Sequence, residues 1–391
     1  MLRQRRSLEH LSDLAALRAD GPIVQLRLPI IGHVHFVTHH AAASALLKDS
    51  ERFQMRDTRG NVTGLQWWMP SALQNLADNM LSSDDPEHRR LRQAVDDAFA
   101  RRPVQGMAAS IERQADALLA AIPKGEAVDL VPTYAAALPV AVIADLIGLR
   151  EDTRTIFFDA ARRLDGVTGM ISFLAMMGPL KRAQTALARE IEVIRTGQGV
   201  PGILKGLVEG QGESGLTDRE IIAMAFLLLV AGHATTKNLI SLSIDELLNR
   251  PEELSKLRAN PDRWPLAVEE FLRYCAPVQM TKPRKVHAAG EFFGTELQVG
   301  DTLMAHIAAA NRDLALFDAP DDLRLDRKPN PHLGFGTGVH FCLGFQLARL
   351  EARIALQKLF ERFAKIERAG EPKLLSSMGQ NGLVSLPVTL A

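Results

Sequence analysis

The sequence predicts a mainly α-helical protein with small β-sheets, and two observations lead to this fold class. Residues 86–276 and 342–365 have the apolar spacing of successive helices. Short β-like runs are confined mainly to residues 21–40, 277–310 and 374–391. The 391 residues contain no internal repeat and no low-complexity segment. We therefore expect the whole chain to form a single domain, although the length would also allow two.

The composition excludes several classes of function. The formal net charge is zero, which argues against a nucleic-acid-binding protein that relies on an overall positive field. Two cysteines, Cys275 and Cys342, are too few for a disulfide framework, a four-cysteine iron–sulfur centre or a cysteine-rich zinc site. The charged start lacks the apolar region of a secretory signal, and the longest apolar run, 221–232, is shorter than a membrane span. We expect a cytoplasmic protein, monomeric by default, that binds neither membrane nor nucleic acid.

The first part of the chain mixes short strands with helices. Two β-like runs, 23–28 and 33–38, precede a helix at 41–47, and residues 54–83 look irregular. A surface loop rich in Gly, Glu, Gln and Ser is expected at 209–215. Helices are expected at 87–100, 107–122, 131–147, 152–163 and 180–196.

Residues 217–249 predict the longest helix. Thr217 and Glu220 have the spacing of a capping box, and Pro251 ends the run. At 1.5 Å per residue this helix would be roughly 50 Å long, enough to cross a domain. Its middle, 226–231, is apolar on all sides, so the helix should lie at the centre of the protein.

A glycine and polar residues follow this apolar middle, at positions 232–236. Such residues cost stability in a buried helix. Either the threonine hydroxyls bond back to the preceding turn, or the segment forms a groove at a reaction centre. We favour the reaction centre, because polar groups held at such a cost tend to mark functional sites.

The chain after this helix contains one more helix and then mostly short strands. The helix is expected at 263–274, with Glu270 and Arg273 on one face. A meander rich in Asp, Pro and Arg follows at 311–331, and 382–390 ends the chain as a hairpin partner. The β-like runs lie at 285–287, 291–297 and 302–306.

Residues 335–344 carry the strongest functional signal, because they place Cys342 in a glycine-rich loop directly before a helix expected at 345–363. Glycines let the backbone bend and approach a flat ligand. The unpaired N–H groups and dipole of the helix favour the thiolate, which suits an axial ligand to haem iron. A lone cysteine can also be a small core residue, or a nucleophile paired with a distant histidine. The loop glycines are Gly336, Gly338 and Gly344.

The full pattern of residues 335–344, Phe-Gly-x-Gly-x-His-x-Cys-x-Gly, resembles the haem-binding loop of the cytochrome P450 family. The resemblance spans nearly the whole chain and is closest to soluble bacterial members. It implies the cytochrome P450 fold, in which a long central distal helix and the proximal helix after the cysteine loop sandwich haem b (iron protoporphyrin IX). It further implies that Cys342 ligates the iron, Phe335 packs near the sulfur, and His340 reaches a haem propionate. Gly336 and Gly344 would lie against the haem.

Further motifs extend this resemblance. His88 and Arg92 match the family's His-x-x-x-Arg, which binds a propionate, although a solvated basic face is the alternative reading. Arg284 matches another propionate-binding arginine. Glu270 and Arg273 match the family's Glu-x-x-Arg, a buried structural ion pair that ties their helix to the meander.

The segment from Ala231 to Thr236 is similar to the distal-helix signature Ala-Gly-x-(Asp/Glu)-Thr-Thr. The resemblance implies that Ala231 contacts the haem, Gly232 leaves room for dioxygen, and Thr235 hydrogen-bonds the oxygen and helps to deliver protons. Ala234 stands where the family has an acid, which puts the usual proton relay in doubt. Water or substrate would then supply the missing link, peroxide would replace dioxygen, or turnover would be slow or atypical; we favour the first because Thr235 is retained.

The meander departs from the family as well. Residues 320–323, Pro-Asp-Asp-Leu, stand where the family has Pro-x-Arg-Phe, so the arginine that completes the triad with Glu270 and Arg273 is missing. Arg324 or Arg327 would substitute for it, and the sequence does not decide between them.

The resemblance implies a monooxygenase that inserts one oxygen atom from O2 into a small apolar organic substrate. Electrons would come from NAD(P)H through ferredoxin and ferredoxin reductase, which Arg101, Arg102 and Arg349 would dock unless they are ordinary solvated charges. Residues 166–179 would form a mobile roof. No cation is clearly placed to anchor an acid, so we expect a neutral substrate. By family analogy the substrate pocket would draw on Trp67, Trp68, Met69, Leu228, Val278, Met280 and Leu383.

Other functions are weighed against this one. A peroxide-driven oxygenase or peroxidase on the same fold is motivated by Ala234. A haem-binding protein without oxygenation, such as a sensor or carrier, belongs to a different class, and the retained Thr235 argues against it. A thiol hydrolase is the least favoured.

Overall fold

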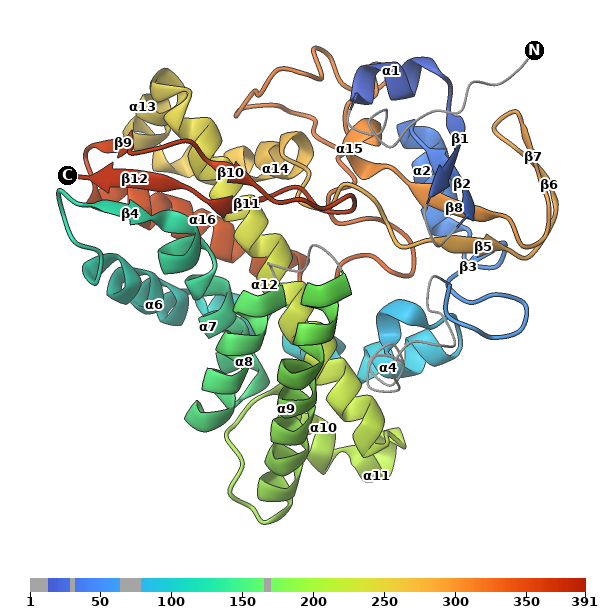
Figure 1. Ribbon diagram of the computed structural model, residues 1–391, viewed down its shortest axis with the longest axis horizontal. Helices are drawn as coiled ribbons and strands as arrows, with labels where there is room; N and C mark the ends of the chain where they lie inside the picture. The colour runs from blue at the N-terminus through green and yellow to red at the C-terminus, as the bar shows by residue number, and fades with distance from the viewer. Residues whose placement is uncertain (1–12, 29–31, 64–78, 165–169) are drawn as a thin grey trace.

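The computed structural model describes residues 13–28, 32–63, 79–164 and 170–391, and helix α12 (Asp218–Leu248) lies at its centre. Figure 1 shows α12 crossing the molecule, with other helices beside it and sheets toward both ends. The prediction of a capped helix at 217–249 is confirmed. The Thr217 side chain accepts a hydrogen bond from the N–H of Glu220, whose carboxylate accepts one from the N–H of Thr217.

The helices that pack against α12 include α7 (Ala137–Ile147), α9 (Met170–Arg195) and α16 (Phe345–Arg362). Among the described helices, α12 alone is long and apolar enough to match a membrane span, although its longest unbroken apolar run is short. Its most apolar window is 56% buried by the surrounding protein, which is the situation of a core helix.

The remaining helices surround this centre. The α-helices are α1 (Leu14–Ala19), α2 (His40–Lys48), α4 (Glu87–Asp96), α5 (Arg101–Gly106), α6 (Ala108–Ala120), α8 (Glu151–Leu164), α10 (Ile203–Glu209), α11 (Gln211–Ser214), α13 (Pro251–Ala259), α14 (Trp264–Tyr274) and α15 (Ile307–Ala310). Short 3-10 helices are η2 (Met80–Ser82), η3 (Asp97–Phe99) and η5 (Pro261–Arg263), and a π-helix, η4 (Val131–Ala135), precedes α7.

Several helix boundaries differ from the prediction. α9 begins at Met170 rather than near 180, because the helix continues through Pro179. The predicted loop at 209–215 contains the single-turn helix α11. α13 was not predicted: Pro251 ends α12 but also stands at the first position of a new helix, where its missing N–H costs nothing.

A five-stranded sheet joins residues 23–54 near the N-terminus with residues 284–305. β2 and β8 pair in parallel, and β1–β2, β5–β8 and β3–β5 pair antiparallel, in the order β1-β2-β8-β5-β3. The predicted run 291–297 is a separate hairpin of β6 (Gly290–Phe292) and β7 (Thr295–Leu297). The sheet strands are β1 (Ile23–Leu28), β2 (Gly32–Val37), β3 (Phe53–Gln54), β5 (Arg284–Val286) and β8 (Thr302–Ala305).

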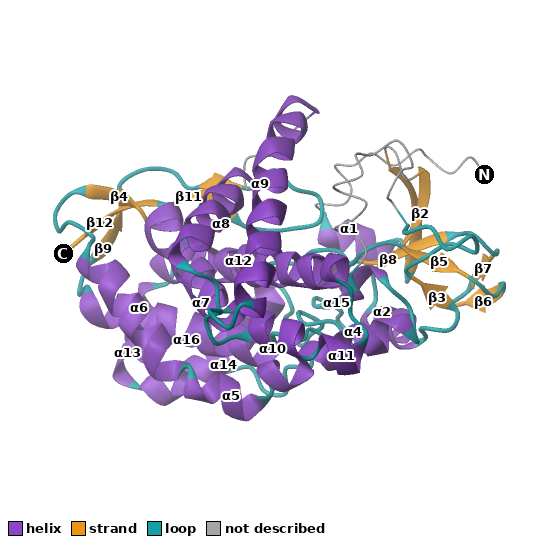
Figure 2. Ribbon diagram, turned by 90° about the horizontal axis from the view of Figure 1, so that it is seen from below, coloured by secondary structure: helices purple, strands orange, loops and turns teal. Residues whose placement is uncertain are grey.

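The C-terminal strands do not join this sheet. β11 (Leu383–Ser385) pairs with β10 (Lys373–Leu374), and β12 (Pro387–Leu390) pairs with both β4 (Ala127–Asp129) and β9 (Ile366–Arg368). Figures 1 and 2 place β4, β9 and β12 at the opposite end of the molecule from β1 and β2. Residues 383–390 therefore pair away from residues 21–40, although residues 379–381 bond to Pro277 and Gln279.

Candidate active site

The cysteine loop leaves the meander and enters α16. The N–H of Cys342 donates to the carbonyl of Phe335 at 2.9 Å, which closes the loop on itself. Gly336 and Gly338 have φ of +67° and +74°, in the left-handed region that favours glycine. A Cβ on Gly338 would lie 2.2 Å from the carbonyl oxygen of Leu47, so only glycine lets this loop pack against the end of α2.

The thiol of Cys342 is crowded by protein but half-exposed. Burial raises its pKa, and the backbone N–H of Gly344 and the charges of Arg92 and Arg349 oppose this rise. The helix-end field expected from the sequence is therefore present at Gly344 but is outweighed by burial in this structure. Cys275 is fully buried in the core, and burial raises its pKa strongly, as expected of an inert core thiol.

Aromatic rings and an ion pair frame the loop on the α16 side. Phe335 and Phe345 lie 6.3 Å apart between ring centroids, and the Arg349 guanidinium lies 4.6 Å from the Phe335 ring. Arg349 also donates two hydrogen bonds to Glu269 of α14, at 2.5 and 2.8 Å. Burial acts to raise the pKa of Glu269, but the hydrogen bonds from Arg349 and His332 outweigh this effect and lower the pKa to about 2. Arg349 is thus held within the fold.

A basic cluster forms from segments far apart in the sequence. The rings of His88 on α4 and His340 in the cysteine loop lie 4.3 Å apart. Arg92, one turn after His88, donates to the carbonyls of Phe341 and Val339 at 2.8 and 3.2 Å, which ties α4 to the loop. Burial, together with the positive charges of His88, Arg284 and Arg92, lowers the pKa of His340 to about 3.

Arg284 on β5 completes this basic cluster. It is 3% exposed, and its Nη1 reaches only backbone carbonyls, at 3.4 to 3.5 Å. Burial lowers its pKa to about 10, and Asp84 opposes this weakly. Asp84 itself accepts hydrogen bonds from the N–H groups of Met55 and Arg56. Among the described residues, no carboxylate forms an ion pair with Arg284.

The centre of α12 has an unusual exposure pattern. Ala231 is exposed, and Gly232, Ala234 and Thr235 are half-buried, although the helix crosses the middle of the protein. The Thr235 hydroxyl donates to the carbonyl of Ala231 at 2.9 Å, which is the bond to the preceding turn that was the alternative to a reaction centre. A Cβ on Gly232 would lie 3.1 Å from Ile143 of α7, so close helix packing gives one reason for this glycine.

These features fit haem. A half-exposed cysteine in a glycine-rich loop can ligate iron, and the buried guanidinium of Arg284, which has no carboxylate partner among the described residues, gains from an anion such as a haem propionate. The exposed alanine on a central helix provides a flat surface without a bulky side chain. Among the described residues there is no group of three His, Cys, Asp or Glu that would hold a metal ion without such a cofactor.

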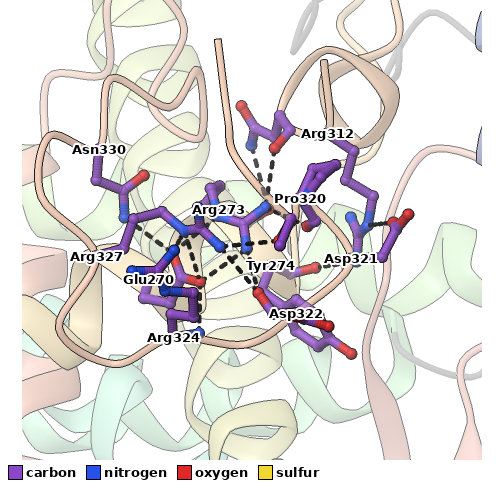
Figure 3. Close-up of polar contacts among 12 residues, drawn as sticks. Glu270, Arg273, Tyr274, Arg312, Pro320, Asp321, Asp322, Arg324, Arg327 and Asn330 are labelled. Carbon is purple, nitrogen blue, oxygen red and sulfur yellow. Dashed lines mark hydrogen bonds and ion pairs between the residues drawn. The ribbon is translucent and has the colours of Figure 1, made fainter. Parts of the chain in front are cut away.

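The buried Glu270–Arg273 pair is present and is completed by Arg327, which resolves the choice that the sequence left open. Arg273 donates to Glu270 at 2.7 and 2.8 Å, and Arg327 Nε lies 3.1 Å from both carboxylate oxygens (Figure 3). Arg324 contributes only its backbone N–H, at 2.8 Å, while its side chain points toward Asp318. Arg327 therefore takes the place of the missing meander arginine.

The expected substrate-pocket residues are only partly brought together. Leu228 and Leu383 belong to the large core cluster, whereas Met280 packs in a smaller cluster under the five-stranded sheet. Val278 is half-buried and forms a β-bridge with Gln380. Trp67, Trp68 and Met69 lie outside the described residues, as does part of the predicted roof. The side chains of Arg101 and Arg102 are likewise outside the description.

Two ionisable residues with shifted pKa values were missed by the analysis of the sequence. Lys282 lies two residues before Arg284, and Glu351 is fully buried in α16. Neither belongs to a motif. Lys282 had a weak signal in its position between two residues assigned to the site, and Glu351 had none.

Comparison with known proteins agrees with this geometry. The family model of cytochrome P450 matches residues 265–390. Polyketide biosynthesis cytochrome P450 PksS of Bacillus subtilis (strain 168) is 33% identical, over 97% of this chain and 95% of that protein. Cytochrome P450 monooxygenase PikC of Streptomyces venezuelae is 36% identical, over 89% of this chain and 82% of that protein.

A solved structure shows the same fold. The myxobacterial cytochrome P450 CYP267B1 in complex with myristic acid superposes with a TM-score of 0.86 at 31% identity, covering 98% of this chain and 97% of that one. The predicted fold class is therefore confirmed. The chain belongs to the cytochrome P450 family and is a haem-thiolate monooxygenase of the bacterial type.

Proposed function

We propose that the cofactor is haem b, with Cys342 as the iron ligand and His88, Arg92, Arg284 and His340 at the propionates. The observation that carries this proposal is the buried Arg284, which has no carboxylate partner among the described residues and belongs to a basic cluster whose His340 lies two residues from Cys342. Phe335 and the loop glycines Gly336 and Gly344 would lie on the sulfur side, and Ala231 on the opposite face. The whole chain, 1–391, would then act as one haem domain.

The bound haem supplies the oxygen-activating chemistry, and the chain's own residues position it and supply protons. Cys342 fixes the haem through its sulfur, and the basic cluster neutralises the haem's carboxylates. Thr235 offers a hydroxyl whose proton is now directed at the Ala231 carbonyl and whose oxygen can accept another hydrogen bond. Ala234 offers none, so a water or the substrate must bring protons to Thr235, with Gly232 leaving room beside it.

Reduction of the purified protein under carbon monoxide tests the iron ligand. The wild-type protein should show the red-shifted Soret band of a thiolate-bound haem, and Cys342→Ser should lose that shift while the chain stays folded. A wild-type protein without the shifted band, or a serine variant that retains it, would contradict the assignment.

The substrate is a small, mostly apolar organic molecule, and the pocket would include Leu228, Val278, Met280 and Leu383 with Trp67, Trp68 and Met69. Ferredoxin and ferredoxin reductase would deliver electrons from NAD(P)H to a monomeric cytoplasmic enzyme. The family resemblance supports these partners. The bidentate bond of Arg349 to Glu269 argues against Arg349 as a freely available docking charge.

Peroxide-driven oxygenation is the second candidate, and Ala234 is the observation that favours it, because some proton deliveries are bypassed when peroxide replaces dioxygen. Product yield with hydrogen peroxide is compared with yield from a ferredoxin system supplied with NAD(P)H. Ala234→Glu should raise the fraction of reducing equivalents that end in product if dioxygen is the oxidant. Unchanged coupling together with efficient peroxide turnover would favour the second candidate.

A further inference from the structure

Lys282 occupies a fixed place next to the basic cluster. The preceding residue, Thr281, is anchored to β8: its N–H donates to the carbonyl of Ala305 at 3.0 Å, and its hydroxyl accepts from the N–H of Ala305 at 3.0 Å. Two residues after Lys282, Arg284 begins β5 and pairs with Leu303. The backbone around Lys282 is therefore held by the sheet on both sides.

The ammonium group of Lys282 reaches toward α4. Its Nζ donates to the hydroxyl of Ser82 at 2.7 Å, and Ser82 is fully buried at the end of η2. The next helix after Ser82 is α4, which carries His88 and Arg92. The hydrogen bond thus connects the segment before Arg284 with the segment before α4, the two segments that lead into the basic cluster.

Lys282 is accessible and yet surrounded by protein. Its side chain is exposed to solvent, while the surrounding protein lowers its pKa to about 8 through desolvation. A lysine on the outer surface would not be desolvated in this way. His340 and Cys342 share this combination of partial exposure and strong desolvation. The combination indicates a side chain inside a recess of the protein.

The carboxylates of the segment after Ser82 already have other hydrogen-bond partners. Asp84 accepts from two backbone N–H groups, and Asp85 contacts His88 and Arg89 at 3.3 and 3.0 Å. Among the residues that the structure describes, no carboxylate forms a hydrogen bond or ion pair with Lys282. A desolvated cation whose only described partner is a neutral hydroxyl can gain from a bound anion.

We propose that Lys282 binds a carboxylate in the haem pocket. Its source is a haem propionate or the acid group of a substrate, and this inference rests on the proposed function of the site. Because the proposed substrate is mostly apolar, a pocket that holds this cation would select apolar molecules that carry a carboxylate over their neutral counterparts. This revises the expectation, drawn from the sequence, that no cation is placed to anchor an acid.

Two measurements on the holoenzyme separate the two sources, using Lys282→Met and Lys282→Arg. The first is the rate of haem transfer from the protein to excess apomyoglobin. The second is the spectral titration of the haem with myristic acid and with methyl myristate. Lys285→Met is the matched control, because Lys285 lies three residues away and donates to Gly300 and Thr302 instead.

A propionate contact predicts that Lys282→Met releases haem at least about tenfold faster, the factor for roughly 1.5 kcal/mol of a charge-assisted bond. If Lys282 contacts the substrate, Lys282→Met should weaken the binding of myristic acid about tenfold or more and leave the binding of the methyl ester unchanged. Lys282→Arg should restore most of either effect, and Lys285→Met should show neither. Lys282→Gln, which keeps a donor for Ser82 without the charge, replaces the methionine variant if that protein does not accumulate.

Wild-type values for both haem release and acid binding in the uncharged Lys282 variants would overturn this inference. An equal loss of acid and ester binding would also overturn it, because that pattern reports a change of shape and not of charge. Failure of the proposed function is distinguishable, since the wild-type protein would then lack the thiolate-bound haem spectrum before any Lys282 variant is examined.

Discussion

At the scale of single residues, two glycines of the cysteine loop differ in a way that the motif does not reveal. Gly336 and Gly338 both have positive φ, so any L-residue there is strained by about 1–2 kcal/mol. A Cβ at Gly336 meets nothing within 4 Å, whereas a Cβ at Gly338 would overlap the Leu47 carbonyl oxygen at 2.2 Å. Only Gly338 therefore carries a packing constraint in addition to the backbone constraint.

We expect Gly338→Ala to displace the loop from α2 and to cost about 3 kcal/mol or more, because overlap with backbone adds to the φ strain. Gly336→Ala should lower the free energy of unfolding only by the backbone strain of a positive φ. Haem content after purification and thermal unfolding of both variants measure the difference. Equal losses in the two variants would show that the approach to Leu47 is not important.

Glu351 shows how burial alone can perturb a residue without a motif. It is fully buried in α16, its Oε1 has no hydrogen-bond partner, and burial raises its pKa from 4.5 to about 8. The carboxyl group is therefore protonated in the folded state at neutral pH. The unfolded chain binds fewer protons than the folded one between these two values, so this group makes stability fall as pH rises from about 4.5 to 8.

Glu351→Gln should remove that pH dependence, since glutamine keeps the shape and cannot ionise. Between pH 5.5 and 7.5, the free energy of unfolding of the wild type should fall relative to the variant by up to about 1.4 kcal/mol per pH unit. Urea unfolding at several pH values measures this slope. A constant difference between the two proteins over that range would contradict the assignment.

The assignment of Cys342, His88, Arg92 and Arg284 to the site stays a prediction from the family motifs, each of which fixes residue type and spacing. They could not predict Lys282 or Glu351. The desolvation of a charged side chain depends on which distant segments surround it, and Ser82 and Lys282 are 200 residues apart. The choice of Arg327 over Arg324 likewise depends on the path of the meander in space.

At the scale of elements, the meander is fastened to α14 by one buried carboxylate. Glu270 is fully buried and receives bonds from Arg273, Arg327, Asn330 and the N–H of Arg324 (Figure 3). Removing one partner of such a network leaves charge buried and uncompensated, whereas an exposed ion pair contributes little. Substitution of Arg327 should therefore affect stability strongly, and substitution of Arg324 should affect it little.

Arg327→Ala should destabilise the protein by roughly 3–5 kcal/mol and sharply reduce the amount that folds with haem. Arg324→Ala should stay within about 0.5 kcal/mol of wild type, because its side chain is 47% exposed and its N–H bond to Glu270 survives the substitution. Chemical unfolding of both variants tests this contrast. A large loss of stability in Arg324→Ala together with a small loss in Arg327→Ala would reverse the assignment.

The longest element was the one most fully predicted from sequence. α12 carries its own capping box and an all-round apolar middle, so local rules set its limits. α9 and the C-terminal strands were predicted less well, for reasons of context. The rule that proline ends a helix does not hold at Pro179, and β11 and β12 find partners at the far end of the molecule.

At the scale of the whole molecule, the proposed haem site is where separate parts of the chain meet. The basic cluster takes His88 and Arg92 from α4, Arg284 from the five-stranded sheet and His340 from the loop before α16. Burying the Arg284 guanidinium in this cluster, where no described carboxylate pairs with it, costs folding free energy. A ligand that carries carboxylates and binds only the folded chain offsets this cost, so haem binding and folding are thermodynamically linked.

This linkage predicts that one substitution acts with opposite sign in the two forms of the protein. Arg284→Gln removes a desolvated cation, so the apoprotein should unfold at the same temperature as wild type or a higher one. In the holoprotein the same change removes a charge-assisted bond to the haem, and the gain in Tm on haem binding should shrink by roughly 2–5 °C. Arg284→Lys, which keeps a positive charge, should restore part of that gain. Thermal unfolding of both forms measures the effect, and an equal drop in both would mean that Arg284 supports the sheet and not the cofactor.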